Sequence, residues 1–237
     1  MPLSPREASF LTLIPLKILD PMNSISILQA FPRVFADEVA MLKQSEVWLC
    51  DLRLEKGQHY LIEAESGAGK SSLCSFIYGY RDDYDGHIMI DREDIRYFSR
   101  DRWGEIRQAE LSILWQELRL FADLSAWDNL IVKNRLTGYK SYRELKGLME
   151  RLGIEPWRDQ SAGKLSLGQQ QRLAILRTLC QPFDFLILDE PISHLDDANA
   201  SIVAQLLAEE AQARGSSIVA TSVGKHLPLH YDHTLNL

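Results

Sequence analysis

Short apolar runs alternate with longer segments of helical periodicity along most of the chain. Apolar runs bounded by Gly, Asp or Pro predict buried strands, and apolar positions that recur every three or four residues predict amphipathic helices. The pattern predicts strands at 47–54, 59–64, 87–90, 111–115, 183–189 and 217–221. It predicts helices at 70–78, 125–136, 141–152, 167–179 and 197–214.

The order of these segments predicts an α/β fold. The strand at 183–189 is apolar along nearly its whole length, as expected of a central parallel strand covered on both faces. The three consecutive helices between 125 and 179 interrupt the alternation, so we expect a helical subdomain inserted at about 118–182. Residues 1–21 contain four prolines and no sustained period, which predicts a tail, or an over-extended start upstream of Met22, before a domain at 22–237.

Composition narrows the function classes. A hydrophobic share of 46% and a charged share of 25% are those of a folded globular protein. The net charge of −7 argues against a nucleic-acid partner, because binding phosphates along a strand needs clustered Lys and Arg.

Cys50, Cys74 and Cys180 are far apart and lack metal-ligand spacing, which predicts reduced thiols. No apolar stretch approaches the roughly 20 residues that cross a bilayer, so work at a membrane requires another chain as anchor.

A glycine-rich loop between a strand and a helix is the first chemical motif. Its glycines let backbone amides converge on phosphate oxygens, its lysine can reach the β and γ phosphates, and its first hydroxyl can ligate Mg²⁺. The strict pattern begins with glycine where this chain has alanine, which is tolerated if that backbone keeps a negative φ. The loop predicts a nucleoside triphosphate site made of Ala64, Glu65, Ser66, Gly67, Ala68, Gly69, Lys70, Ser71 and Ser72.

Two adjacent carboxylates, Asp189 and Glu190, end the apolar strand at 183–189. Open α/β sheets bind their ligands at the carboxyl ends of the strands. Asp189 can hold Mg²⁺ through its water shell, and Glu190 can orient and deprotonate an attacking water. In isolation the same residues also fit an ordinary turn. The phosphate loop is what favours a role for the pair in nucleotide chemistry.

The segment 165–172, Leu-Ser-Leu-Gly-Gln-Gln-Gln-Arg, opens the helix that precedes these carboxylates. Together with the two motifs above, it resembles the nucleotide-binding domains of the ATP-binding cassette (ABC) family, whose signature is Leu-Ser-Gly-Gly-Gln. The resemblance extends over about 28–237. It implies a P-loop NTPase core, with a RecA-like mixed sheet flanked by helices, an N-terminal antiparallel β-subdomain and an inserted α-helical subdomain. ATP and Mg²⁺ are the implied cofactors.

The resemblance also assigns roles to single residues. Gln116, which closes a strand expected at 113–116, matches a glutamine that ligates Mg²⁺ and senses water, and Ser193 and Asp196 fall in the D-loop. Family cassettes clamp two ATP molecules head to tail, so a second copy or a homologous cassette is an expected partner. The signature residues expected to complete the partner's ATP site are Ser166, Leu167, Gly168 and Gln169, and the expected metal ligands are Ser71, Gln116 and Asp189.

Two positions depart from the family pattern. Leu167 replaces a signature glycine, and Ser222 stands where the family has a switch histidine that contacts the γ phosphate. Ser222 therefore joins Glu190 and Gln116 as a candidate catalytic residue, with His226 a poorly placed alternative. Retained ATP binding with slow hydrolysis is the expected consequence. Phe31 and Phe35 both remain open as adenine-stacking residues, although core packing is the favoured interpretation of either one, since aromatic side chains mostly serve packing.

The resemblance favours the ATPase subunit of a transporter that drives a separately encoded integral-membrane permease. Such a subunit would be cytoplasmic and peripheral at the inner face of the membrane. Residues 119–127 would face the permease's coupling helix, and 117–130 look like the lipoprotein-release, macrolide-export and cell-division branch. The alternative from another class is a nucleotide-dependent switch without transport. A nucleotide kinase is a remoter alternative, because it would not need the segment 166–172.

Overall fold

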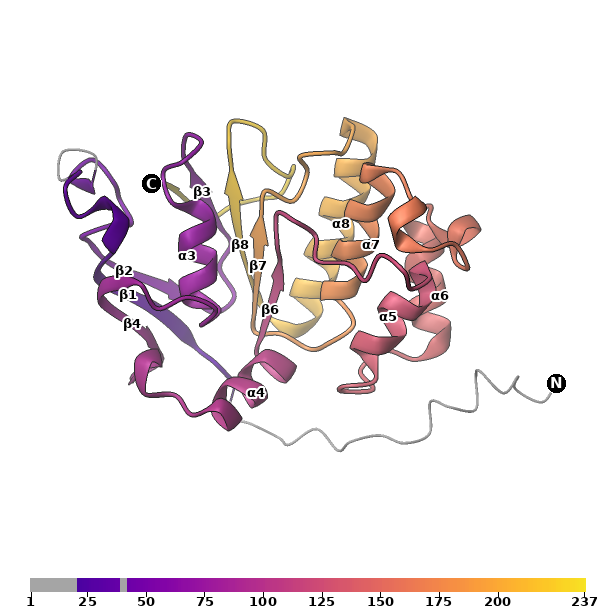
Figure 1. The fold of residues 1–237 in the computed structure, drawn as a ribbon, viewed down its shortest axis with the longest axis horizontal. Helices are drawn as coiled ribbons and strands as arrows, with labels where there is room; N and C mark the ends of the chain where they lie inside the picture. The colour runs from indigo at the N-terminus through magenta and orange to yellow at the C-terminus, as the bar shows by residue number, and fades with distance from the viewer. Residues whose placement is uncertain (1–20, 39–41) are drawn as a thin grey trace.

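A five-stranded parallel sheet forms the centre of the molecule in the computed structural model, which describes residues 21–38 and 42–237 (Figure 1). The tail expected at 1–21 therefore lies almost entirely outside the described residues. All four strand pairings in this sheet are parallel. In order across the sheet, the strands are β6 (Leu111–Leu114), β7 (Phe185–Asp189), β8 (Ser217–Ser222), β3 (Tyr60–Glu63) and β9 (His233–Asn236).

A second, four-stranded sheet is antiparallel and lies beside the first (Figure 1). Ile25 pairs with Leu54 on one neighbouring strand and with Ile90 on the other, and all three side chains are buried. The expected mixture of parallel and antiparallel pairing is thus divided between two sheets. The strands, in order, are β2 (Asp51–Glu55), β1 (Ser24–Pro32), β4 (Tyr84–Ile90) and β5 (Glu93–Asp94).

Two hydrophobic cores lie on opposite faces of the parallel sheet. Successive side chains of a strand point to opposite faces, so Leu186 and Leu188 of β7 join one core while Phe185 and Ile187 join the other. The strand is buried at every position. This double burial explains why its sequence is continuously apolar.

The helices cover both faces of the parallel sheet. α3 (Lys70–Ile77) and α7 (Leu167–Thr178) lie on opposite sides of it, and α8 (Asp197–Arg214) lies beside α7 (Figure 1). The other helical segments are η2 (Arg33–Phe35), η3 (Ile95–Tyr97), α4 (Arg100–Ala109), α5 (Ala126–Asn134), α6 (Tyr142–Arg151), η4 (Glu155–Trp157) and η5 (Ala162–Lys164). Ser or Asp side chains cap the N-termini of α4, α5, α6, α7 and α8 by accepting a backbone N–H.

Two expectations about local structure were wrong, and some elements were missed. The strand expected at 47–54 begins only at Asp51, because the Ser45 hydroxyl accepts the N–H groups of Val47 and Trp48 and holds a turn there. The strand expected to end at Gln116 stops at Leu114. The pattern also missed β1, α4 and β9, of which α4 buries only Ile106 and β9 has no fully buried residue. None of the helices in the described ranges is long and apolar enough to cross a membrane.

Candidate functional site

The glycine-rich loop joins β3 to α3 at the carboxyl end of the parallel sheet. Gly67 and Gly69 adopt left-handed φ values of 88° and 100°, which glycine reaches at little cost. A Cβ on Gly69 would stand 3.0 Å from Phe35 Cε2 and 3.3 Å from a Trp48 ring carbon. Ala64 does not have a positive φ. Alanine is therefore tolerated at this position, where the strict phosphate-loop pattern has glycine.

Lys70 opens α3 and is almost completely buried. Its ammonium group donates to the carbonyls of Ala64 at 3.2 Å and Glu65 at 2.8 Å, which curls the side chain over the loop. It also lies 3.7 Å from Glu190 Oε1. The lysine charge, the N-terminal amides of α3 and the carboxylate are therefore assembled around one point, where phosphate oxygens can be bound.

The rest of the loop is fixed by contacts from outside it. The Trp48 indole donates to the Ala68 carbonyl at 3.3 Å, and Arg81 donates to the Ser72 hydroxyl at 3.0 Å. Glu65 and Ser66 are exposed. The indole thus holds the middle of the loop and the guanidinium its C-terminal end, while Glu65 and Ser66 remain open to a ligand.

Asp189 and Glu190 share one neighbour, Thr221 on the adjacent strand β8. The Thr221 hydroxyl donates to Asp189 Oδ1 at 2.9 Å and accepts the Glu190 N–H at 3.2 Å. Burial raises the pKa of Asp189, while hydrogen bonds from Ser71 and Thr221 act in the opposite direction. Glu190 has a φ of 49°, an uncommon value for a residue with a Cβ, so its backbone is held in a strained turn.

Replacing Thr221 with valine is expected to remove two hydrogen bonds, one to the Asp189 carboxylate and one from the Glu190 backbone N–H. The free energy of unfolding should fall by about 1–3 kcal/mol because two buried polar groups lose a partner. ATP turnover should fall by roughly tenfold, equivalent to ~1.4 kcal/mol. Without the hydroxyl the pKa of Asp189 should rise further. The acid limb of the pH–activity profile, where activity falls as the pH decreases, should therefore shift to higher pH.

The matched control is Thr178→Val, because Thr178 is also buried and its hydroxyl donates within α7 to the Ile175 carbonyl at 2.7 Å. It should cost stability and leave the acid limb of the pH profile unmoved. Chemical denaturation and pH-dependent phosphate release measure the two effects. An unchanged acid limb in Thr221→Val would contradict this role for Thr221.

Gln116 bridges the loop and the carboxylates from just beyond the end of β6. Its amide oxygen lies 3.5 Å from the Ser71 hydroxyl, and its amide nitrogen donates to Glu190 Oε2 at 3.3 Å. Ser71, Gln116 and Asp189 thus offer a hydroxyl, an amide oxygen and a carboxylate, an all-oxygen set that suits Mg²⁺. Within the described residues, no group of three or more His, Cys, Asp or Glu side chains is arranged so that it could hold a metal ion.

The signature segment begins α7. The Ser166 hydroxyl accepts the Gln169 N–H at 3.3 Å, and the Gln169 side chain accepts the Ser166 N–H at 2.8 Å, which completes a capping box. Leu167 is 58% exposed, so its side chain projects from the helix start. A Cβ on Gly168 would lie 3.0 Å from the His194 carbonyl oxygen, which explains glycine there.

Gln171 connects the signature helix to the carboxylates, a link that sequence reasoning missed. Its amide nitrogen donates to the Glu190 carbonyl and the Ser193 hydroxyl, both at 3.3 Å, and its oxygen accepts the His194 N–H at 2.8 Å. The D-loop residue Asp196 caps α8 by accepting the Asn199 N–H. A polar residue at the fifth position of α7, on the face that should be apolar, was the available signal for Gln171.

Ser222 ends β8 with a buried side chain. Its hydroxyl donates to the Lys225 carbonyl at 2.7 Å, which holds the turn after the strand. Lys225 lines a cavity of about 260 Å³ together with Glu190 and Val223, although sequence reasoning did not consider it. His226 instead lies 3.8 Å from Glu63 and edge-on to Tyr231.

The motifs form two groups within one chain. The phosphate loop, the strand-end carboxylates, Gln116 and Ser222 gather at the carboxyl edge of the parallel sheet. The signature residues begin α7, which lies across the sheet from α3, the helix that the phosphate loop opens (Figure 1). The chain alone thus assembles the first group into a site that can bind a nucleoside triphosphate and polarise a water near Glu190.

The chain is similar in sequence to known proteins. Residues 48–193 match the family model described as ABC transporter. The lipoprotein-releasing system ATP-binding protein LolD of Roseobacter denitrificans is 32% identical over 72% of this chain and 77% of its own length. The thiamine import ATP-binding protein ThiQ of Vibrio parahaemolyticus is 31% identical over 77% of each.

Among solved structures, a similar one is the dimeric post-hydrolysis state of the ATP-binding cassette MJ0796 bound to ADP and phosphate. It is 25% identical, with a TM-score of 0.65, over 74% of this chain and 78% of its own. The family model covers more than half of the chain and includes the phosphate loop, Gln116, the signature and both carboxylates. The chain therefore belongs to the ABC transporter family and is one of its ATP-hydrolysing, ATP-binding domains.

Proposed function

We propose that this ATPase is the subunit of a transporter that drives a separately encoded membrane permease through ATP-dependent head-to-tail dimerisation. The observation that supports the proposal is the division of the motifs: α3, which the phosphate loop opens, and α7, which the signature begins, lie on opposite sides of the sheet (Figure 1). We therefore expect the signature that completes this ATP site to come from a second cassette. Within the chain, we propose a domain at 22–237 with a helical subdomain at about 118–182.

The proposed division of labour follows the geometry. The loop amides and Lys70 bind the phosphates, while Ser71, Gln116 and Asp189 hold Mg²⁺, which supplies charge neutralisation for the transferred phosphoryl group. Glu190 accepts the proton of the attacking water, and Gln116 orients the Glu190 carboxylate through its 3.3 Å hydrogen bond. In the partner's site, the Ser166 hydroxyl and the Gly168 amide complete the binding of the γ phosphate.

Phe35 is the better placed of the two adenine candidates. Its ring edge lies against Gly69 of the phosphate loop, and its side chain is partly exposed. Phe31 instead lies in β1 opposite Asp85, away from the loop's contacts. We assign adenine stacking to Phe35.

Slow hydrolysis is part of the proposal. The Ser222 hydroxyl already donates its hydrogen bond to the Lys225 carbonyl at 2.7 Å, so it is not free to donate to a γ phosphate. Leu167 projects from the helix start that would face the partner's nucleotide. Both observations support weak closure and slow turnover with ATP binding retained.

Replacing Leu167 with glycine is expected to tighten the ATP-bound dimer, because it removes an exposed side chain from the interface. In a Glu190→Gln background the dimer should form at roughly tenfold lower protein concentration, equivalent to ~1.4 kcal/mol. Sedimentation with ATP and Mg²⁺ measures this. Leu167→Ala, with a small side chain and better helix propensity, separates crowding from helix stability. Equal dimerisation of wild type and both variants would contradict crowding by Leu167.

Partner capture can distinguish a transporter subunit from a nucleotide-dependent switch without transport. Several relatives are lipoprotein-releasing system ATP-binding proteins named LolD, in keeping with the branch that 117–130 resembles. A nucleotide-dependent switch would form the same dimer without a permease.

The test is a pull-down from solubilised membranes with tagged Glu190→Gln and ATP, with ADP as the control. Capture of a multi-span membrane protein that depends on ATP supports the transporter. A closed dimer that captures only soluble proteins supports the switch.

A further inference from the structure

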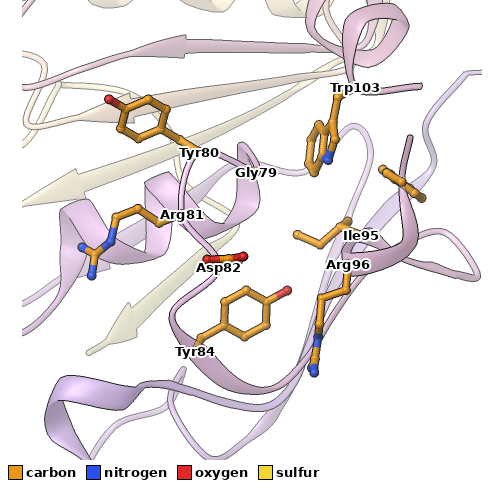
Figure 2. Close-up of a pocket in the computed structure, with 9 residues that line it drawn as sticks. Gly79, Tyr80, Arg81, Asp82, Tyr84, Ile95, Arg96 and Trp103 are labelled. Atoms are coloured by element: carbon orange, nitrogen blue, oxygen red, sulfur yellow. The ribbon is translucent and has the colours of Figure 1, made fainter. Parts of the chain in front are cut away.

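Two cavities of similar volume in the described part of the chain differ in what lines them. One, of about 280 Å³, lies beside the turn that follows α3, and Figure 2 shows Tyr84 and Trp103 on two sides of it. None of the described residues that line it belongs to the phosphate loop or to the strand-end carboxylates. The other cavity, of about 260 Å³, does reach the ATP site. The residues that line it are Glu190, Ile192, Ser193, Leu195, Val223 and Lys225.

This second cavity adjoins the place where phosphate oxygens are expected. Glu190 lines it, and Glu190 Oε1 lies 3.7 Å from the Lys70 ammonium group. Strand register brings the turn after β8 to the same place, because Asp189 pairs with Thr221 and the two strands leave the sheet side by side. Glu190 and Lys225, which follow the two strands, therefore line one cavity.

Lys225 combines a fixed backbone with a flexible side chain. Its carbonyl accepts from the Ser222 hydroxyl at 2.7 Å, and its N–H donates to the Val223 carbonyl at 2.9 Å. Among the described residues that line the cavity, it is the only one with a cationic side chain. A lysine carries its charge at the end of a flexible four-carbon stem. The ammonium group can therefore change partners while the turn stays in place.

The present partners of the Lys225 ammonium group hold it weakly. It lies 2.8 Å from Asp197 Oδ1, and it donates to the Leu195 carbonyl at 3.5 Å. The Asp197 side chain is 93% exposed and that of Lys225 is 56% exposed. An ion pair so open to water contributes little stability, because solvent screens it. Exchanging Asp197 for a phosphate oxygen therefore costs little free energy.

We infer that Lys225 is a catalytic residue of this ATPase, and that its ammonium group leaves Asp197 and binds a γ-phosphate oxygen of ATP from the side of the cavity. The inference rests on the roles that the proposed function gives to Lys70 and Glu190, and it adds a second cation at the terminal phosphate. A phosphate group carries more negative charge than one exposed carboxylate, so it is the stronger partner for a lysine. The Ser222 hydroxyl is committed to the turn, so Lys225 supplies the contact that Ser222 does not.

The ammonium group acts through its charge and transfers no proton. The water oxygen forms a bond to the γ phosphorus while Glu190 takes a proton from that water. The bond from the γ phosphorus to the bridging oxygen breaks, and ADP leaves with the electron pair. Lys225 keeps its protons and stabilises the negative charge that develops on the transferred group. Its loss should therefore slow the chemical step more than it weakens nucleotide binding.

Turnover and nucleotide binding give the first test. Lys225→Met keeps the apolar stem and leaves both backbone contacts of the turn intact. Phosphate release at saturating ATP should fall by at least about tenfold, because one group that stabilises transition-state charge is lost. In a Glu190→Gln background, ATP should bind roughly threefold more weakly, as for one partly exposed charge contact, whereas ADP, which lacks the γ phosphate, should bind as before. The control is Lys146→Met, at a lysine 3.5 Å from Glu150, which should change neither quantity.

Asp197 gives the second test, because it competes for the same ammonium group. Asp197→Asn should raise phosphate release about threefold by freeing Lys225, the size of effect expected of an exposed ion pair. The same change added to Lys225→Met should have no effect, since the carboxylate acts through the lysine. Lys225→Arg keeps a cation of similar reach and should retain more turnover than Lys225→Met.

The outcomes separate the inference from the proposed function. If Glu190→Gln keeps its turnover, the assignment of the site fails and the inference fails with it. If Glu190→Gln is inactive while Lys225→Met hydrolyses ATP like the wild type, only the inference fails. The capture of a membrane protein tests the transporter assignment separately.

Two further results would also overturn the role of Lys225. Equal weakening of ATP and ADP binding in Lys225→Met would show that the lysine supports the turn and not the γ phosphate. A gain from Asp197→Asn that persists in Lys225→Met would show that Asp197 acts through its own charge.

Discussion

Replacing Glu190 with glutamine is expected to lower phosphate release at saturating ATP by roughly 10²–10⁴-fold, the contribution of a positioned general base. The Glu190 carboxylate accepts from Gln116 at 3.3 Å and lies 3.7 Å from the Lys70 ammonium group. Glutamine keeps the shape and the acceptor oxygen but cannot take a proton from water. ATP binding should therefore persist, and the ATP-bound dimer should accumulate because the nucleotide is not cleaved.

Phosphate release, nucleotide binding by fluorescence and dimer formation by sedimentation measure the three parts of this result. The matched control is Glu150→Gln, on α6 and exposed, which should behave as wild type. A Glu190→Gln protein that retains more than a tenth of wild-type turnover would show that another group accepts the proton.

Replacing Ser222 with histidine is expected to raise turnover by up to about 10²-fold, at the low end of general acid–base effects. The wild-type hydroxyl is committed to the Lys225 carbonyl at 2.7 Å. An imidazole at the end of β8 has a longer reach, beside the cavity that Val223 shares with Glu190. The gain should appear in the rate at saturating ATP rather than in nucleotide affinity, because the phosphate loop is unaltered.

Ser222→Ala is the control that isolates the lost hydrogen bond to Lys225 from the gained imidazole. It should keep turnover close to that of wild type and lower only stability, by about 0.5–1.5 kcal/mol for one hydrogen bond. A histidine variant no faster than wild type would show that the serine does not limit hydrolysis, and slow turnover would then need a different explanation.

Local sequence was sufficient to predict an element or a motif wherever the residues that specify it lie close together in the chain. The helix predicted at 197–214 has those bounds in the structure, because Asp196 caps its start and Gly215, at a φ of 60°, ends it. The phosphate loop was equally readable, since its glycines and Lys70 do their work within one strand–loop–helix unit. Signals of this kind depend on backbone geometry that neighbouring residues fix.

Elements without such a signal were missed. The helix α4 buries only Ile106, and the charged residues at 96–102, which lead into and begin this helix, mask its period. The structure shows specific contacts there. Arg96 lies over the Tyr84 ring at 5.2 Å, and Arg102 donates to the buried Glu110 at 3.0 Å.

By itself, the sequence determined the family motifs and their order, because each motif is contiguous. Tertiary structure alone decided which side chains meet: Thr221 reaches Asp189 across 32 positions, and Lys133 faces Arg177 from a different helix. Such contacts follow from strand order and helix packing, which no local pattern encodes. They also decided that the Ser222 hydroxyl holds the turn after β8.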